Sequence, residues 1–164
     1  FHPQAAIPDP LWSRGLGDVY KRQASRGLGA ELSKIFSLTH HIIAVARTIG
    51  ALEALDDEIK SKGGSCTLAP IDLTDEKATA QLCRSIFDRW GTLKIWAHTA
   101  IHAAPLGPVM TIDSSDWNKS VKNNVTALAH FIPMVTPLLG DDSEVVFFED
   151  KTIMKKFSSI YGAT

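Results

Sequence analysis

The stretch Ala24-Ser-Arg-Gly-Leu-Gly29, which continues as Ala30-Glu-Leu-Ser-Lys-Ile-Phe36, decides the fold of this 164-residue chain. Two glycines, Gly27 and Gly29, stand directly before a segment typical of a helix. Glycines at a strand-to-helix turn let backbone N–H groups and the helix N-terminus approach a pyrophosphate, which a Cβ atom would obstruct. The stretch therefore predicts a glycine turn that opens a helix.

Downstream of the glycines, short apolar runs alternate with longer helical stretches, which is typical of βαβ units and a parallel sheet. The expected strands cover residues 41–46, 66–71, 93–97 and 144–148. The expected helices cover 30–36, 48–62, 74 or 75 to 90, 114 or 115 to about 139, and the opening of one more at 157–164. The chain is therefore predicted to have an α/β fold, a doubly wound parallel sheet.

Apolar spacing and breakers add detail to these helices. The second helix should bury one face, and the third should bury residues spaced by four. These faces are Leu52, Leu55 and Ile59 in the second helix, and Ala78, Leu82, Ile86 and Trp90 in the third. Glycines should stop three of the helices, and two prolines should kink or shorten the end of the longest. These residues are Gly63-Gly64, Gly91 and Gly140, with Pro133 and Pro137.

Residues 1–23 break this order, because they contain three prolines and the run 16–23 mixes three charges with a glycine. The strand that feeds a glycine turn lies in the middle of a doubly wound sheet and should be continuously apolar. The run 11–23 also resembles translated sequencing adaptor. The sequence therefore predicts a non-native or disordered leader at 1–23 and a partial domain at 24–164, with a degraded first strand. A divergent strand at 18–21 is the alternative.

Composition excludes several classes of protein. The chain is 45% hydrophobic and 21% charged, its net charge is −1, and it has two cysteines. These values are typical of a globular domain, without the charge pattern of nucleic-acid binding, a secretory signal or a membrane span. The cysteine content favours a reducing compartment, so we expect a cytoplasmic location. His98 and His102 are four residues apart but belong to a predicted loop, so we expect no metal site.

The glycine turn resembles the cofactor turn of the short-chain dehydrogenase/reductase family, whose members bind NAD(P) on a Rossmann-like fold. In that family a Thr-Gly pair precedes the turn, where this chain has Arg22 and Gln23. Later residues that match the family follow in the same order along the chain. The cofactor-binding residues that the resemblance implies are Ser25, Arg26, Gly27, Leu28, Gly29, Arg47, Asp72, Leu73, Thr99 and Ala100.

Two arginines bear on the choice of cofactor. Arg47 follows the second predicted strand, where an acidic residue would bond the ribose 2′-hydroxyl of NAD. A cation at that place suits the 2′-phosphate of NADP instead, and Arg26 inside the glycine turn points to the same choice. Either arginine alone could be a solvated surface charge. Together they favour NADP over NAD as the cofactor.

The resemblance also implies catalytic residues. Asn124 matches the helix asparagine that holds a water in the family's proton relay, and Tyr161 matches the tyrosine of its Tyr-x-x-x-Lys motif. The chain ends at Thr164, one residue before the expected lysine. Asp150 lies near the place of the family's catalytic serine; a protonated Asp150 could donate a hydrogen bond to a substrate carbonyl, and Thr152 is the alternative.

The resemblance implies an NADP-dependent oxidoreductase that transfers hydride between nicotinamide and a small carbonyl or alcohol substrate. The chain would cover the cofactor half of such an enzyme without its C-terminal strands, so we expect this fragment to be inactive. A homo-oligomer is expected only of the full-length parent. The alternative is a non-catalytic nucleotide-binding or interaction domain on the same fold, since His98-Thr99 and the absent serine depart from the family pattern.

Overall fold

The computed structural model describes residues 11–16, 27–148, 160 and 164. Its strands form one parallel sheet of five strands in the order β3-β2-β1-β4-β5, so the predicted α/β fold with a parallel sheet is confirmed. The strands are β1 (Leu11–Leu16), β2 (His41–Ala46), β3 (Cys66–Pro70), β4 (Leu93–His98) and β5 (Leu139–Phe147).

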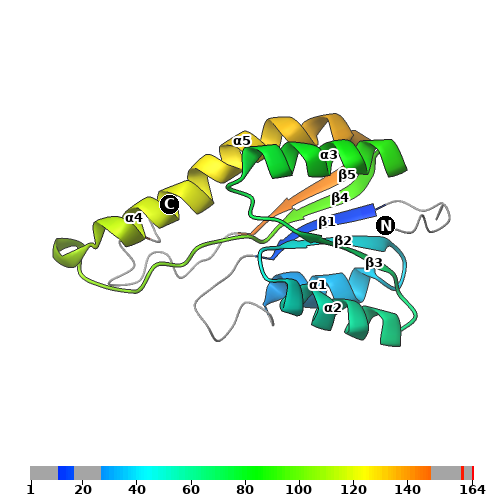
Figure 1. Ribbon diagram of the computed structural model, residues 1–164, viewed down its shortest axis with the longest axis horizontal. Helices are drawn as coiled ribbons and strands as arrows, with labels where there is room; N and C mark the ends of the chain where they lie inside the picture. Colours follow the sequence, from blue (N-terminus) through cyan, green and yellow to red (C-terminus); the bar gives the residue numbers. More distant parts are fainter. Residues whose placement is uncertain (1–10, 17–26, 149–159, 161–163) are drawn as a thin grey trace.

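Helices cover both faces of the sheet: α1 and α2 lie on one face, and α3 and α5 lie on the other (Figure 1). Together α4 and α5 form a long helical rod that extends beyond the sheet (Figure 1). The helices are α1 (Leu28–Phe36), α2 (Ile49–Ser61), α3 (Glu76–Trp90), α4 (Ser114–Ser120) and α5 (Ala127–Val135), with 3₁₀ turns at Val109–Thr111 and Thr136–Leu138. Among the described residues, none of these helices combines the length and the apolar character that crossing a bilayer requires.

The core has two layers because β2 is buried along its whole length, with alternate side chains on opposite faces. Large side chains dominate the layer under α3 and α5, which contains Ile43, Val45, Ile86, Leu93, Trp96, Phe131, Val135 and Leu138. The layer under α1 and α2 is rich in alanine and contains Ala30, Ala44, Ala46 and Ala97 beside Ile42, Leu52, Leu55 and Ile59. The predicted buried face of the second helix is therefore confirmed.

Two of the predicted glycine stops are confirmed. Gly63 follows the end of α2 with φ of 79°, and Gly91 follows the end of α3 with φ of 76°. Side chains with a Cβ rarely adopt this left-handed region, so glycine closes both helices at low cost. The third predicted stop was wrong, because Gly140 lies inside β5.

The predicted buried face of α3 needs a correction. Buried side chains are Thr79, Cys83 and Ile86, whereas Leu82 and Trp90 are only partly buried against the core. An α-helix has 3.6 residues per turn, so positions spaced by four rotate progressively away from one face. Thr79 tolerates burial because its hydroxyl donates to the Asp75 carbonyl oxygen at 2.7 Å.

The long helix also differs from its prediction. Its N-cap is Asp113, whose carboxylate accepts from the backbone N–H groups of Ser115 and Asp116, rather than Ser114 or Ser115. Between α4 and α5 lies a π-helical segment, Val121–Thr126, and α5 gives way at Val135 to the 3₁₀ turn that contains Pro137. The effect predicted for the prolines at the end of this helix is thus observed.

Strand β5 begins earlier than predicted. Leu139 pairs with Leu93, and pairing then shifts so that Glu144 faces Ile95, which leaves 140–143 as an irregularity. The Ser143 hydroxyl holds this irregularity by donating to the Leu93 carbonyl oxygen at 2.5 Å and accepting from Gly140 N–H at 2.8 Å. The regular part of the strand matches the predicted apolar run.

The first 23 residues hold a strand that the sequence did not predict. Residues Leu11–Leu16 form β1 in the centre of the sheet, between β2 and β4. A disordered leader is therefore wrong for these six residues, because parallel backbone pairing to two neighbours is available to polar and apolar sequences alike. Their foreign origin stays a prediction. The alternative strand at 18–21 lies outside the described residues, as does most of the helix expected at 157–164.

Candidate functional site

The ends of three strands meet at one edge of the sheet. Arg47 follows β2, Asp72 follows β3 and Ala100 follows β4. Because these strands are parallel, their carboxyl ends open onto the same crevice, which is where open α/β sheets bind ligands. The three candidate residues therefore lie at one edge of the sheet.

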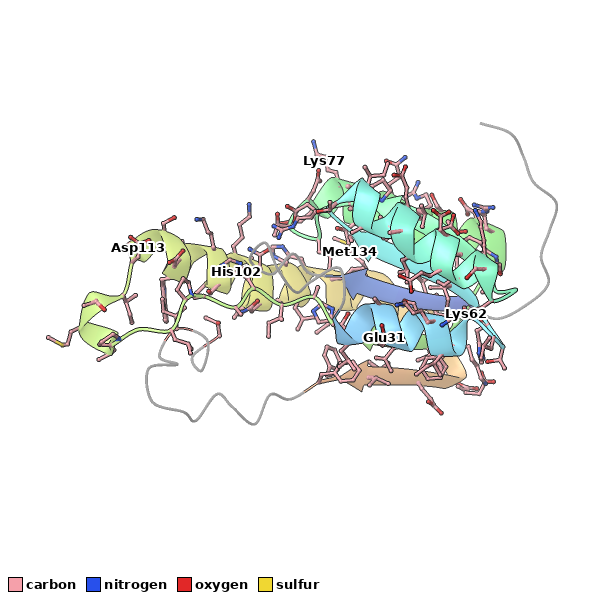
Figure 2. The ribbon with its side chains drawn as sticks, turned by 90° about the horizontal axis from the view of Figure 1, so that it is seen from below. Glu31, Lys62, Lys77, His102, Asp113 and Met134 are labelled. Atoms are coloured by element: carbon pink, nitrogen blue, oxygen red, sulfur yellow. The ribbon has the colours of Figure 1, made fainter. Side chains whose placement is uncertain are left out.

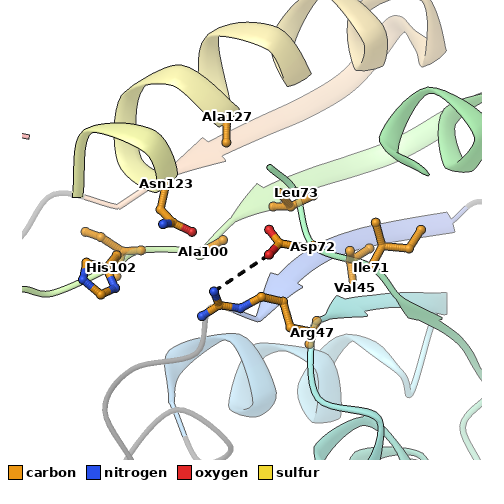
Figure 3. A pocket seen from close by; sticks show the side chains of 11 residues that line it. Val45, Arg47, Ile71, Asp72, Leu73, Ala100, His102, Asn123 and Ala127 are labelled. Atoms are coloured by element: carbon orange, nitrogen blue, oxygen red, sulfur yellow. Dashed lines mark ion pairs between the residues drawn. The ribbon is translucent and has the colours of Figure 1, made fainter. Parts of the chain in front are cut away.

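A pocket lies at this edge, and we call it the edge pocket (Figure 3). Its floor is apolar, and its rim carries one cation, one carboxylate, one imidazole and one amide. The lining residues are Val45, Ala46, Arg47, Ile71, Asp72, Leu73, Ala100, Ile101, His102, Asn123 and Ala127. An apolar pocket with a few polar groups at its rim is typical of a small-molecule site.

Arg47 and Asp72 face each other across the edge pocket (Figure 3). The guanidinium Nη1 lies 4.0 Å from Asp72 Oδ2, and the side chains are 37% and 42% exposed. The other carboxylate oxygen, Oδ1, accepts from the backbone N–H of Thr74 at 2.9 Å, which fixes the aspartate in its turn. A half-exposed pair at this distance contributes little stability, so a ligand could separate the two groups at low cost.

Among the described residues, the start of α1 has no side-chain cap. Gly27 caps the helix without a side-chain hydrogen bond, and its carbonyl accepts from Ala30 N–H at 2.9 Å. Gly29 is buried, and its carbonyl accepts from the Ser33 hydroxyl at 2.9 Å. The first N–H groups of a helix have no partner within the helix and carry a partial positive charge. The predicted glycine turn thus ends in a helix terminus that suits an anionic group.

Asn124 in the π-helical segment clamps the loop after β4. Its Nδ2 donates to the His102 carbonyl oxygen at 2.9 Å, and its Oδ1 accepts from His102 N–H at 2.7 Å. The same Nδ2 donates to the Thr164 hydroxyl at 3.0 Å. The partly buried amide therefore has the partners that burial requires, and it fixes the backbone position of His102 at the rim of the edge pocket.

Two histidines near the strand ends were not predicted as site residues. His102 lines the edge pocket, and burial together with Arg47 lowers its pKa. Burial also lowers the pKa of His98, whose ring lies 5.8 Å from that of Phe147. Both imidazoles therefore favour the neutral form. Among the described residues, His102 Nε2 and His98 Nδ1 are buried without a hydrogen-bond partner. Their position at and after the end of β4 is the sequence signal that could have identified them.

A second pocket, which we call the lysine pocket, adjoins the first and has a volume of about 590 Å³. It shares Arg47, Asp72 and Asn123 with the edge pocket. Its complete lining is Arg47, Asp72, Thr74, Ser115, Asn118, Lys119, Lys122 and Asn123. The two lysines were not predicted as site residues, although their spacing of three on a predicted helix places them on one face.

The structure brings together only part of the predicted site. Arg47, Asp72, Leu73 and Ala100 line the edge pocket, whereas Thr99 is half-buried beside it without lining it. Leu28 is 51% exposed at the start of α1. Four predicted residues lie outside the described part of the chain: Ser25, Arg26, Asp150 and Tyr161. Within the described ranges, no group of three or more His, Cys, Asp or Glu side chains could hold a metal ion.

Comparison with protein families decides the affiliation. A family model described as short chain dehydrogenase matches residues 23–148. The chain belongs to the short chain dehydrogenase family. The match begins one residue before Ala24, so it includes the glycine turn and all three strand ends that line the edge pocket.

Known proteins extend the comparison with this family. The chain is 39% identical over 64 residues to a fatty acyl-CoA reductase of Acinetobacter baylyi, covering 38% of this chain and 22% of that protein. It is 36% identical over 78 residues to a fatty acyl-CoA reductase of Mycobacterium tuberculosis, covering 47% and 26%. The aligned part of the chain thus spans about a quarter of these curated relatives.

A solved structure shows the same fold. A short-chain type dehydrogenase/reductase from Mycobacterium ulcerans matches with a TM-score of 0.82 and 18% identity, covering 97% of this chain and 58% of that one. The likeness at this level of identity concerns the fold alone.

Proposed function

We propose that this protein is an NADP-dependent oxidoreductase of the short chain dehydrogenase type, which transfers hydride between nicotinamide and a carbonyl or alcohol substrate. The observation that carries the proposal is the edge pocket, where Arg47 and Asp72 face each other above an apolar floor (Figure 3). The adenosine part of the cofactor would lie there, against Leu73 and Ala100, with Asp72 accepting hydrogen bonds from the adenine amine.

The described residues fit a dinucleotide. Gly27 has no side chain that could cover the N-terminus of α1, and none of the side chains in the described part of the chain caps that helix. The first backbone N–H groups of α1 would hold the pyrophosphate of the dinucleotide. This arrangement supports binding of the phosphates at α1 and of adenosine in the edge pocket, so one ligand would span the two sites.

Arg47 supports the choice of NADP over NAD. Its guanidinium follows β2 and is 37% exposed, so it can reach a ligand at the rim of the edge pocket. A planar cation suits the dianionic 2′-phosphate, whereas NAD-binding sites favour an acidic residue that bonds the ribose hydroxyls. Arg26, outside the described residues, would add a second cation to the same phosphate.

The proposed chemistry divides between the cofactor and the chain. When bound, the cofactor would supply hydride from C4 of the reduced nicotinamide or accept it at C4 of the oxidised nicotinamide. Tyr161 would exchange a proton with the substrate oxygen, and Asn124 would support the proton relay from its place in the π-helical segment. Asp150 would donate a hydrogen bond to the substrate oxygen in its protonated form. We expect Asp150→Ala in the complete gene product to lower kcat at least tenfold, and an unchanged kcat would remove Asp150 from the mechanism.

A non-catalytic nucleotide-binding domain is the second candidate. The observation that favours it is the engagement of Asn124, whose two amide hydrogens are both donated to other protein groups. His98 also favours the non-catalytic domain, because it departs from the family pattern and its ring packs against Trp96 and Phe147.

Equilibrium titration with NADPH and NADH, followed by turnover assays on a panel of carbonyl compounds, separates the candidates. The proposed enzyme should bind NADPH more tightly than NADH and oxidise it in the presence of a carbonyl substrate. Tight NADPH binding by the complete gene product without turnover on any carbonyl would favour the non-catalytic domain. Tighter binding of NADH than of NADPH would overturn the proposed cofactor.

A further inference from the structure

The lysine pocket carries an excess of positive charge. Three cations line it, Arg47, Lys119 and Lys122, against the single carboxylate of Asp72. The other lining side chains are uncharged hydroxyl and amide groups, which can donate hydrogen bonds to an anion. A volume of about 590 Å³ lies within the range of small-molecule sites. The pocket therefore combines the size and the charge that suit a small anionic group.

The two lysines are available to a ligand. Both side chains are exposed, and among the described residues neither forms an ion pair. Elsewhere on the surface, lysines lie against carboxylates: Lys34 against Glu31 and Glu58, Lys60 against Asp56, and Lys94 against Asp142. Among the described residues, the ammonium groups of Lys119 and Lys122 thus have no carboxylate within ion-pair distance.

The backbone that carries these lysines is held in place. Asp113 caps α4 with two hydrogen bonds of 2.8 and 3.0 Å, and the Asn123 amide donates to the Lys119 carbonyl oxygen at 2.7 Å. One turn later, Asn124 joins the helix to the loop after β4. The lysines therefore project from a fixed helix, and only their flexible side chains must be ordered when a ligand binds.

The lysine pocket is continuous with the edge pocket through Arg47, Asp72 and Asn123. We infer that the lysine pocket binds a phosphate group, which Lys119 and Lys122 hold beside the adenosine site. This inference rests on the proposed function for the position of adenosine, whereas the charge of the pocket does not depend on it. Arg47 borders both pockets, so a phosphate there competes with Asp72 for the guanidinium.

Two sources could supply the phosphate. One is the 2′-phosphate of bound NADP, in which case the lysines determine cofactor specificity together with Arg47. The other is a separate phosphorylated small molecule that binds next to the cofactor. Both sources present a dianionic phosphomonoester to the same cations, so the experiment must distinguish them by their covalent link to adenosine.

Titration calorimetry at low salt, where exposed cations are least screened, tests the inference with three probes: 2′,5′-ADP, 5′-AMP, and inorganic phosphate added to protein saturated with 5′-AMP. The test variant is Lys119→Gln with Lys122→Gln. The matched control is Lys62→Gln with Lys77→Gln, which removes the same charge from exposed lysines that line neither pocket. In Figure 2, Lys62 lies at the opposite end of the molecule from Asp113 at the start of α4.

If the phosphate belongs to NADP, the test variant binds 2′,5′-ADP about tenfold more weakly, while binding of 5′-AMP changes less than about twofold. If it belongs to a separate ligand, the test variant instead loses binding of inorganic phosphate in the presence of 5′-AMP. The control variant should bind 2′,5′-ADP, and inorganic phosphate in the presence of 5′-AMP, as tightly as the unmodified protein does. Either loss in the test variant alone supports the inference.

The inference is overturned if the test variant binds all three probes as the control does, or if it binds 5′-AMP and 2′,5′-ADP more weakly by the same factor. Failure of the proposed function has a different signature, because the unmodified protein would then fail to bind 5′-AMP. In that case the lysines are still tested directly by inorganic phosphate added to the protein without nucleotide, and equal binding by the test and control variants would overturn the inference independently.

Discussion

At the scale of single residues, Arg47 has the largest expected influence on cofactor choice. Its guanidinium lies at the rim of both pockets and 4.0 Å from Asp72. We predict that Arg47→Glu weakens NADPH binding at least tenfold. The substitution replaces the cation proposed to bind the 2′-phosphate with a carboxylate, whose negative charge repels that phosphate. Binding of NADH should be unchanged or tighter. Fluorescence titration with both cofactors measures the ratio of the two dissociation constants.

Arg84→Glu provides the control for this substitution. Arg84 is exposed on α3, lines neither pocket, and its substitution changes the net charge by the same amount. If both variants lower NADPH affinity equally, the effect comes from the overall charge, and Arg47 has no specific role.

Cys83 and Cys66 should differ in reactivity. Cys83 is 6% exposed, and burial raises its thiol pKa to about 11, whereas Cys66 is partly exposed at the start of β3. Only the thiolate attacks an alkylating reagent. At pH 8 we therefore predict that iodoacetamide modifies Cys66 first, with Cys83 at least tenfold slower. Mass spectrometry of digested samples gives both rates, and equal rates in the folded protein would contradict the burial of Cys83.

At the scale of elements, Asn124 joins the π-helical segment to the loop after β4. Removal of its amide leaves the N–H and C=O of His102 without these partners. We predict that Asn124→Ala lowers the free energy of unfolding by about 2–4 kcal/mol, since buried backbone groups that lose their hydrogen bonds incur a desolvation penalty. Urea denaturation measures this change.

Asn118→Ala serves as the comparison for Asn124→Ala. Asn118 lies exposed on the same helical rod, one turn and a half earlier, and its substitution should change stability by less than about 0.5 kcal/mol. If both variants lose the same free energy of unfolding, the rod is sensitive to any asparagine substitution. The hydrogen bonds between Asn124 and His102 would then make no specific contribution to stability.

Elements with a strong local pattern could be predicted from the sequence. β2 is a continuous apolar run, and α2 has regularly spaced apolar residues between clear end signals, so both were predicted to within one residue. The π-helical segment could not be predicted, because 121–126 contains no proline or glycine and its partners lie 22 residues earlier in the chain. β1 was missed since its residues are not continuously apolar. Tertiary pairing determined both segments.

The residues of the candidate site likewise divide into those that the sequence indicated and those that only the structure revealed. Arg47, Asp72 and Ala100 were implied by the resemblance to the short-chain dehydrogenase/reductase family, and each follows a strand of the parallel sheet, so their positions at one edge agree with the strand pattern. The lysines at positions 119 and 122 come from a helix that reaches the crevice only through the packing of the rod, so the pattern of strands gave no indication of them. Residues supplied by strand ends are therefore predictable, whereas those supplied by a neighbouring rod require the structure.

At the scale of the whole molecule, buried histidines make stability depend on pH. Burial lowers the pKa of His41, and the charge of Arg89 lowers it further; burial also lowers those of His98 and His102. Unfolded histidine titrates near 6.5, so the unfolded chain binds more protons than the folded chain below that pH. The stability is therefore complete above about pH 6.5 and is lost as the pH falls toward the lowered values.

His41 allows this prediction to be measured. Its two ring nitrogens lie 2.7 and 2.8 Å from the hydroxyl oxygens of Ser65 and Thr67. We predict that the urea midpoint falls between pH 7.5 and pH 5, and that His41→Asn reduces this fall without abolishing it, because the other two histidines remain. If the variant and the unmodified protein lose stability in parallel, His41 does not contribute to the pH dependence.

The alanine-rich layer under α1 has a consequence for how this protein can evolve. Ala30, Ala44, Ala46 and Ala97 are each at most 6% exposed, and three of them lie on β2 and β4. A larger side chain at any of them would overpack the layer and displace α1. Selection for ligand binding would then act on side-chain volume at Ala44 and Ala97, which line neither pocket, as well as at Ala46, which lines the edge pocket. Amino-acid substitutions at these alanines during evolution should be confined to glycine, alanine and serine. The layer under α3 and α5 should exchange one large residue for another more freely.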